Sequence, residues 1–361
     1  METGVLKKRI MTIGRELNKR KISCLVLTKP ANVTYVTGFS GEDSWAVIAK
    51  GRVYLLTDSR YTEQAHGECP HSTIIQRTAP LPQALGKLLK KLKSVRIITV
   101  EKSASIEDFE QIKKAVRARL KSAAGIIETF RSAKDSSEIA AIKAAASIAA
   151  KALKQILPHI RPGITENQLA GLLDFQIRKL GATSGFETIV AFGPNASRPH
   201  HKPTTKKLKC KDAVLIDFGA KYKGYCSDIT RCFVFGSPTR LYKKAYDVVQ
   251  QAQLAAIKRV KAGVEMVRVD AAAREVIRKS GLPVYGHGTG HGFGLEIHEL
   301  PFLKPESKGK LKAGQIITVE PGVYIPGKLG VRIEDDILVT PTGCEILTRN
   351  CPHAPVLPRQ K

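Results

Sequence analysis

Apolar and polar positions alternate in two different ways along the first part of the chain. Apolar residues recur at near-helical spacing over residues 5–20, and helical patterns return over 81–93 and 105–121, which predicts helices there. Short β-type runs separate them at 23–28, 45–49, 53–57 and 95–100. Because strands and helices alternate, we expect residues 1–130 to form a compact α/β domain.

The pattern changes near Arg131, where we place a domain boundary. Asp135, followed by Glu138 and then by an Ala-rich run, is typical of a helix start. We expect helices at about 136–156, 166–180, 240–261 and 266–280, and strands at 187–193, 213–219, 228–235, 315–320 and 331–339. Residues 131–361 are therefore predicted to form an α+β domain, with helices packed on a mostly antiparallel sheet.

The segment 213–235 is predicted to be a β-hairpin that carries two carboxylates. An apolar run leads into Asp217, a Gly- and Lys-rich turn at 221–224 reverses the chain, and a β-prone run follows Asp228. We expect the two carboxylates to face each other across adjacent strands. A buried, unpaired carboxylate is costly, and a bound cation would remove that cost. On the hairpin alone, solvated aspartates at a sheet edge are an equally good interpretation.

Three later segments carry further ligand-type residues: 286–299, 317–322 and 331–335. Together with the hairpin they resemble the metallopeptidase family with the pita-bread fold, which includes methionine aminopeptidases, Xaa-Pro aminopeptidases and Xaa-Pro dipeptidases (prolidases). All five positions of that family's metal-ligand set hold the expected residues, namely Asp217, Asp228, His291, Glu320 and Glu334. The motifs at 32–39 and 57–61 also resemble the creatinase, prolidase and aminopeptidase P N-terminal domain, which methionine aminopeptidases lack.

The resemblance implies a site for two divalent metal ions. Asp217 would chelate one ion, and Asp228 and Glu334 would bridge both. His291 and Glu320 would bind the other ion, and Glu320 would also take a proton from the bridging water, leaving a hydroxide as the nucleophile. Four carboxylates with one imidazole suit Mn, which we expect first, or Co, Zn or Fe.

Other residues are expected to act on the substrate. By resemblance, His200 and His298 contact the peptide and stabilise the transition state, with imidazoles that could donate to the developing oxyanion. Gly286-His287-Gly-Thr-Gly resembles the aminopeptidase P form of the motif, which makes His287 a substrate-binding candidate, although a loop histidine is the alternative. The glycines around it fit a loop where backbone must approach a ligand closely.

Two neighbours of these residues leave alternatives open. Arg332 is expected to position Glu334 or a nearby acid, unless it lies on the surface. His201 stands where many relatives carry a small residue, so it either narrows the pocket or points away.

The residues after His298 bear on the substrate's length. Some dipeptidases of this family carry an Arg shortly after His-Glu-x-Pro to hold the dipeptide carboxylate, whereas Phe302 follows that motif here. We therefore expect an Xaa-Pro aminopeptidase, with an Xaa-Pro dipeptidase as the nearest alternative. The expected partners are peptides with proline in the second position and, by resemblance, a second copy of the chain in a homodimer.

Composition supplies one competing interpretation. The net charge of +27 fits a pita-bread scaffold that binds nucleic acid. The lysines are spread along the chain without interleaved aromatic residues, and the five-ligand set is intact, so we expect a solvated basic surface instead.

The expected location is the cytoplasm. No apolar run approaches the ~20 residues of a membrane span, so no membrane partner is expected. The start of the chain lacks an apolar core with a cleavage site. The seven cysteines are scattered, without a Cys-x-x-Cys pair, which favours reduced thiols.

Overall fold

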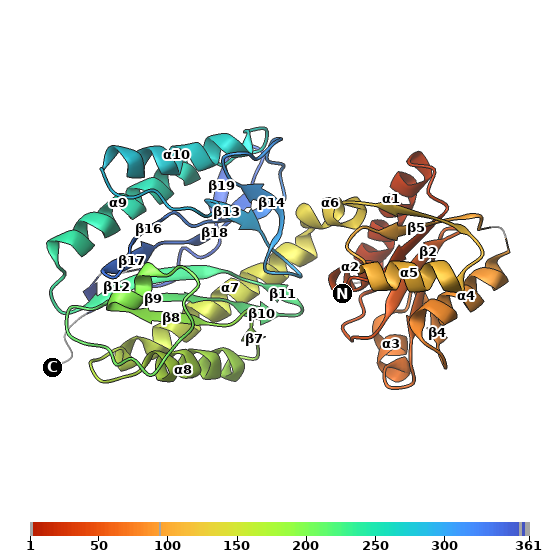
Figure 1. Ribbon diagram of the computed structural model, residues 1–361, viewed down its shortest axis with the longest axis horizontal. Helices are drawn as coiled ribbons and strands as arrows, with labels where there is room; N and C mark the ends of the chain where they lie inside the picture. Colours follow the sequence, from red (N-terminus) through yellow and green to blue (C-terminus); the bar gives the residue numbers. More distant parts are fainter. Residues whose placement is uncertain (1–2, 94, 354–355, 358–361) are drawn as a thin grey trace. The chain divides into compact units, whose positions relative to one another are not determined.

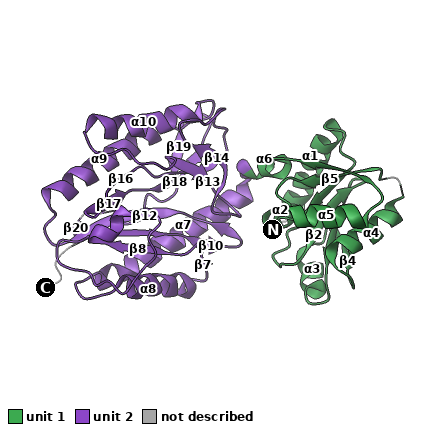
Figure 2. Ribbon diagram, in the orientation of Figure 1, with its two compact units in different colours: residues 1–131 green, residues 132–361 purple. Residues whose placement is uncertain are grey.

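The computed structural model describes residues 3–93, 95–353 and 356–357 (Figure 1). The chain divides into two compact units, residues 1–131 and residues 132–361, shown in green and purple in Figure 2. Each unit has its own hydrophobic core. Within the described parts, no helix combines the length and the apolar character that crossing a bilayer requires.

The first unit is built around a six-stranded mixed sheet of order β4-β3-β2-β1-β5-β6. Its elements in chain order are α1 (Thr3–Lys19), β1 (Cys24–Leu27), α2 (Pro30–Thr37), β2 (Trp45–Ala49), β3 (Arg52–Thr57), α3 (Thr62–Glu68), β4 (Ser72–Gln76), α4 (Leu81–Leu92), β5 (Ile97–Glu101), α5 (Ile106–Ala115), β6 (Arg119–Ala123) and α6 (Ile126–Ser132). Val26 and Val47 pack in a core with residues of α4 and α5 on one face of the sheet. Leu25 and Leu55, whose side chains point to the opposite face, are also fully buried. Both faces of the sheet are covered, and the predicted α/β character is confirmed.

The predicted helix at 105–121 is wrong in its second half. Helix α5 ends at Ala115, Val116 is extended, and residues 119–123 form β6, which pairs in parallel with β5 from Ile97↔Arg119 onward. The basic pattern of this segment fits an amphipathic helix, but the free edge of β5 offers backbone hydrogen bonds that the local pattern does not reveal.

The second unit contains two larger sheets, β20-β12-β9-β8 and β14-β13-β15-β18-β19, and two small ones, β11-β10-β7 and β16-β17. Its elements are α7 (Ser136–Ile156), α8 (Glu166–Lys179), β7 (Thr183–Ser184), β8 (Ile189–Phe192), β9 (Ala213–Phe218), β10 (Ala220–Tyr222), β11 (Tyr225–Cys226), β12 (Ile229–Phe235), α9 (Arg240–Ile257), α10 (Met266–Lys279), β13 (Gly290–Gly292), β14 (Glu299–Leu303), β15 (Ile316–Val319), β16 (Gly322–Ile325), β17 (Leu329–Arg332), β18 (Asp335–Val339), β19 (Cys344–Ile346) and β20 (Val356–Leu357).

Helices cover the strands of this unit on two sides (Figure 1). Helices α7 and α8 share a core with β8, β9 and β12, and α9 and α10 share another with strands that include β15, β17 and β18. Helix α7 begins with the predicted capping box between Asp135 and Glu138. All pairings except that of β12 with β20 are antiparallel among the described strands of this unit, so the predicted α+β arrangement is confirmed.

Two details of the predicted strands are corrected. The strand expected at 331–339 is two strands: β17 pairs with β16, β18 pairs with β15, and Glu334 lies in the break between them. In the hairpin, Asp217 pairs with Thr230 and not with Asp228, which precedes β12. Residues two apart share a face of a strand, so Asp228 and Thr230 still project to the same side.

Candidate metal centre and active site

A cavity of about 290 Å³ opens in the second unit and brings the predicted site residues together. Its lining comes from segments that are far apart in the sequence: Phe186, Ile189, Pro199, His200, Asp217, Asp228, His287, Gly288, Gly290, His291, Ile297, His298, Phe302, Lys304, Glu320, Arg332 and Glu334. Every residue predicted to bind metal or substrate is among them. Their roles in binding and catalysis stay predictions.

Acidic and imidazole groups cluster in the lining of this cavity. Asp228, His291 and Glu334 are buried, and each offers one ligand atom within 4.8 Å of the other two. His291 Nε2 lies 3.6 Å from Asp228 Oδ2 and 3.4 Å from Glu320 Oε1. Four of the five predicted ligands are therefore linked by short contacts.

Asp217 is held at the site by an arginine. Arg332 Nη2 donates to Asp217 Oδ2 at 2.5 Å, so the predicted positioning role of Arg332 is directed at Asp217 and not at Glu334. Asp217 Oδ1 is buried and has no hydrogen-bond partner among the described residues. A buried carboxylate oxygen without a partner is costly unless a cation meets it.

The electrostatics of the cluster also fit a cation. Burial, and then the negative charge of Glu334, raise the pKa of Asp228 well above its usual range. Burial and the charge of Glu320 do the same for the pKa of Glu334, and burial raises the pKa of Glu320 to about 7. Burial lowers the pKa of His291 to about 4, which leaves its ring neutral and able to coordinate. Carboxylates beside one neutral imidazole are a suitable donor set for divalent transition metals.

Local backbone features explain how this cluster forms. Residues 214–216 of β9 are buried, and this anchored strand places Asp217 at the cavity. On the neighbouring strand, Thr230 Oγ1 donates a hydrogen bond to Glu334 Oε2 at 2.6 Å and fixes that carboxylate. Gly290 and Gly292 flank His291, and a Cβ on either would collide with the backbone of Thr318 or Leu300. At these two glycines the close approach is to neighbouring strands, and the approach of this loop to a ligand stays a prediction.

The sequence matches known families over most of its length. Residues 140–341 match metallopeptidase family M24, and residues 9–133 match the creatinase/prolidase N-terminal domain. The chain belongs to metallopeptidase family M24.

Several relatives of this M24 chain are similar over nearly its full length. The uncharacterized peptidase YqhT of Bacillus subtilis is 39% identical over 332 residues, covering 91% of this chain and 94% of that protein. The Xaa-Pro dipeptidase of Bacillus anthracis superimposes with a TM-score of 0.93 at 38% identity, covering 97% of this chain and 99% of that one. The X-Pro aminopeptidase of Thermotoga maritima superimposes with a TM-score of 0.86 at 36% identity, covering 95% and 99%. The predicted pita-bread architecture is confirmed.

The three predicted substrate histidines of the M24 site occupy different environments. His200 and His298 are exposed at the cavity, and the His298 ring lies 4.4 Å from that of His291, centroid to centroid. His287 is more enclosed: Nε2 is 3.0 Å from the Tyr324 hydroxyl, and burial lowers its pKa to about 4. Tyr324 also receives a hydrogen bond from Arg332 at 2.8 Å, so His287 is tied indirectly to the metal-ligand cluster.

The structure also resolves the alternatives for His201. Its side chain is buried, and Nε2 lies 2.9 Å from Glu166 Oε2, so the ring points toward Glu166 and does not line the cavity. The pair belongs to a hydrogen-bonding centre around Glu166 that also holds Phe192 N, Asn195 and Thr204.

Sequence reasoning missed several residues of the site. Tyr324 lies on β16 without any motif of its own, and no signal in its neighbourhood points to it. Phe186, Ile189 and Ile297 form apolar parts of the cavity lining. Lys304 follows the last residue of β14, and its position two residues beyond Phe302 could have suggested it if the extended chain continued past Leu303.

Proposed function

We propose that this protein is a dinuclear metallopeptidase that removes the N-terminal residue preceding proline, an Xaa-Pro aminopeptidase. The observation that carries the proposal is that one cavity gathers all five predicted ligands, with one carboxylate oxygen of Asp217 buried and unpartnered among the described residues. Similarity to proteins named Xaa-Pro peptidases supports the same reaction class.

The ligand set would be shared between two divalent ions, Mn first among them. Asp217 would hold one, His291 and Glu320 the other, and Asp228 with Glu334 would bridge them. When bound, such a pair supplies a nucleophilic water at neutral pH.

Protein groups would manage protons and charge around the scissile amide. Glu320 would accept a proton from the nucleophilic water and pass it to the leaving nitrogen, because its carboxylate lies among the predicted metal ligands, 3.4 Å from His291 Nε2. His200 and His298 would donate hydrogen bonds to the carbonyl oxygen as negative charge develops on it. His287 would orient the peptide beside Glu320, whose Oε2 lies 3.9 Å from His287 Nδ1.

Proline recognition would rely on apolar contact. A bond preceding proline has no amide N–H, and the ring fixes φ near −65°, so a selective site must hold the ring itself. Phe186, Ile189 and Ile297 supply apolar surface in the same cavity. The cavity thus combines a hydrolytic centre with a surface for the proline ring.

An Xaa-Pro dipeptidase is a second candidate, and Lys304 favours it. Phe302 provides no cation at the position where the resemblance places an Arg, but Lys304 lines the same cavity. Its Nζ is 3.0 Å from Glu306 Oε1, and both side chains are exposed, so a dipeptide carboxylate could replace Glu306 as its partner.

Kinetics of the Mn-loaded protein separate the two candidates. The aminopeptidase should cleave Ala-Pro-Ala at least as well as Ala-Pro, and should cleave Ala-Ala-Ala poorly. Phe302→Arg should shift preference toward Ala-Pro by at most ~1.5–3 kcal/mol, the value of a charged hydrogen bond. Wild-type cleavage restricted to dipeptides, abolished by Lys304→Gln, would overturn the aminopeptidase in favour of the dipeptidase. No hydrolysis of any Xaa-Pro peptide would overturn both.

A further inference from the structure

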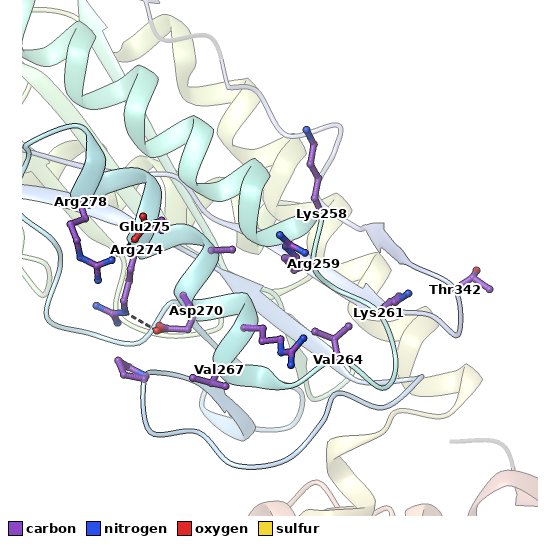
Figure 3. Close-up of a pocket in the computed structure, with 14 residues that line it drawn as sticks. Lys258, Arg259, Lys261, Val264, Val267, Asp270, Arg274, Glu275, Arg278 and Thr342 are labelled. Carbon is purple, nitrogen blue, oxygen red and sulfur yellow. Dashed lines mark hydrogen bonds and ion pairs between the residues drawn. The ribbon is translucent and has the colours of Figure 1, made fainter.

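Arg274 of α10 connects an outer groove of the second unit to the loop that carries His287. The groove, of about 990 Å³, is lined by α10 and by the segment that follows α9 (Figure 3). Figure 3 shows Arg274 paired with Asp270 one turn earlier on the same helix. This groove is distinct from the cavity that holds the predicted metal ligands.

Each nitrogen of the Arg274 guanidinium makes a hydrogen bond. Nε donates to Asp270 Oδ2 at 2.8 Å, Nη1 to the carbonyl oxygen of Tyr285 at 2.8 Å, and Nη2 to that of His287 at 2.6 Å. The group also lies 4.4 Å from the centroid of the Tyr285 ring. A planar guanidinium can make these contacts at once, whereas an ammonium cannot reproduce the fork.

Asp270 fixes the same loop at a second point. Its Oδ1 accepts a hydrogen bond from Thr289 Oγ1 at 2.7 Å, and Thr289 Oγ1 lies 2.6 Å from the Tyr285 hydroxyl. Asp270 and Thr289 are buried, so these bonds are shielded from water. Arg274 therefore holds the start of the 285–289 loop, and Asp270 holds its end.

A chain of contacts connects this loop to Asp217, one of the predicted metal ligands. His287 Nε2 lies 3.0 Å from Tyr324 Oη, Arg332 Nη1 donates to the same oxygen at 2.8 Å, and Arg332 Nη2 binds Asp217. A shift of the His287 backbone would move its ring relative to the peptide and to this chain.

We propose that Arg274 and Asp270 are a positioning pair that sets His287 for substrate from the groove side. The proposal rests on the proposed peptidase function and adds a residue pair that lies outside the catalytic cavity. Neither residue touches the peptide in this scheme, and both act through the 285–289 loop.

Arg278 supplies a matched control. It lies on the same helix, lines the same groove, and pairs at 2.5 Å with Glu275, where both side chains are largely exposed. Arg278→Ala therefore removes the same charge from the same surface, and a surface pair of this kind contributes little to stability.

The first test compares peptide hydrolysis by three variants. Arg274→Ala should lower kcat/KM for Ala-Pro-Ala by roughly 10–100-fold, the effect of a misplaced site group. Guanidinium ion at sub-denaturing concentration should restore part of the loss, since the removed group borders an open groove. Arg274→Lys should stay impaired, and Arg278→Ala should match the wild type. A wild-type kcat/KM for Arg274→Ala, or a loss equalled by Arg278→Ala, would overturn the proposal.

The second test does not depend on activity. Amide hydrogen exchange in the metal-free protein should accelerate over residues 285–289 in Arg274→Ala and Asp270→Asn, with no change in Arg278→Ala. Faster exchange spread over the whole second unit would show general destabilisation and contradict a positioning role. If the wild type hydrolyses no peptide, the proposed peptidase function is wrong. The positioning pair is then tested by hydrogen exchange alone, and unchanged exchange over residues 285–289 in both variants would reject it.

Discussion

Arg332 and Asp217 lie 115 residues apart in sequence, and Arg332 Nη2 donates to Asp217 Oδ2 at 2.5 Å. Arg332 ends β17 and Asp217 lies in β9, so the bond joins two sheets of the second unit. It turns one oxygen of Asp217 toward the guanidinium and leaves the other buried without a partner among residues 3–93, 95–353 and 356–357. Arg332 thereby orients a predicted metal ligand.

The first prediction concerns this orientation. Arg332→Gln should weaken Mn²⁺ binding by about 10–100-fold, because groups that orient metal ligands typically have effects of that size. Isothermal titration of the metal-free variant measures the affinity, and circular dichroism checks that it is folded. Arg349→Gln, at an exposed position of the same unit, is the control. Equal Mn²⁺ affinity in both variants would show that Arg332 does not support the metal centre.

The second prediction concerns the two bridging carboxylates. Asp228→Asn combined with Glu334→Gln should abolish binding of two ions, since both bridges lose their charge. The metal-free double variant should melt higher than metal-free wild type, because two buried carboxyl groups, whose pKa values are raised by burial and by neighbouring negative charge, are replaced by neutral ones.

Differential scanning calorimetry with and without Mn²⁺ tests this double variant. Wild type should gain about 2.7 kcal/mol of stability for each bound ion at a metal concentration 100 times the dissociation constant of its site. A Mn²⁺-dependent rise in melting temperature that survives in the double variant would refute the ligand assignment.

The third prediction separates substrate residues from metal ligands. His200→Ala and His298→Ala should each lose most of the turnover while keeping two bound ions, because both histidines lie outside the five-ligand set. Activity assays paired with metal analysis of dialysed protein measure the two properties. A histidine whose loss removes metal as well as activity would instead be a ligand.

The fourth prediction uses the pH dependence of the Glu166 centre. Burial alone raises the pKa of the Glu166 carboxyl, but hydrogen bonds from His201, Thr204 and the Phe192 amide outweigh burial, and the net shift of its pKa is downward from 4.5. A lowered pKa contributes stability above the unfolded value of 4.5, and this contribution is lost as pH falls through the folded value.

Glu166→Gln should therefore cost about 1–3 kcal/mol at neutral pH, where buried donors lose their acceptor. The difference from wild type should shrink as pH falls below about 4.5, when the wild-type carboxyl also loses its charge. Urea unfolding at several pH values measures it, with Glu187→Gln, an exposed residue, as the control. A constant difference across this range would contradict the ionised hydrogen-bonding role.

The fifth prediction concerns the net charge of +27. If it belongs to a solvated surface, binding to nucleic acid should be weak and should vanish steeply as salt rises, because binding then depends on counterion release. Fluorescence anisotropy with labelled single- and double-stranded oligonucleotides measures the salt dependence. Tight binding that persists near ~0.2 M salt would favour a nucleic-acid-binding role.

Local sequence patterns were sufficient for much of the fold. The capping box at Asp135 and the apolar periodicity of α7 depend on residues three or four apart, so both can be recognised from the local sequence. The same periodicity failed at 116–121, because pairing with the edge of β5 outweighed the helical preference of that segment.

The candidate site divides in the same way. The family resemblance of the motifs indicated the residues around the cavity, Asp217 and His291 among them, whereas the hairpin pattern alone left solvated aspartates as an equally good interpretation. The contact of Arg332 with Asp217, the turning of His201 toward Glu166, and the hold of Arg274 on His287 were decided only by the tertiary structure. The bonds to Asp217 and Glu166 join residues 115 and 35 positions apart, and the bond to His287 joins a helix to a loop. The geometry of these hydrogen bonds depends on how strands and helices pack together, and a local sequence pattern does not predict that packing.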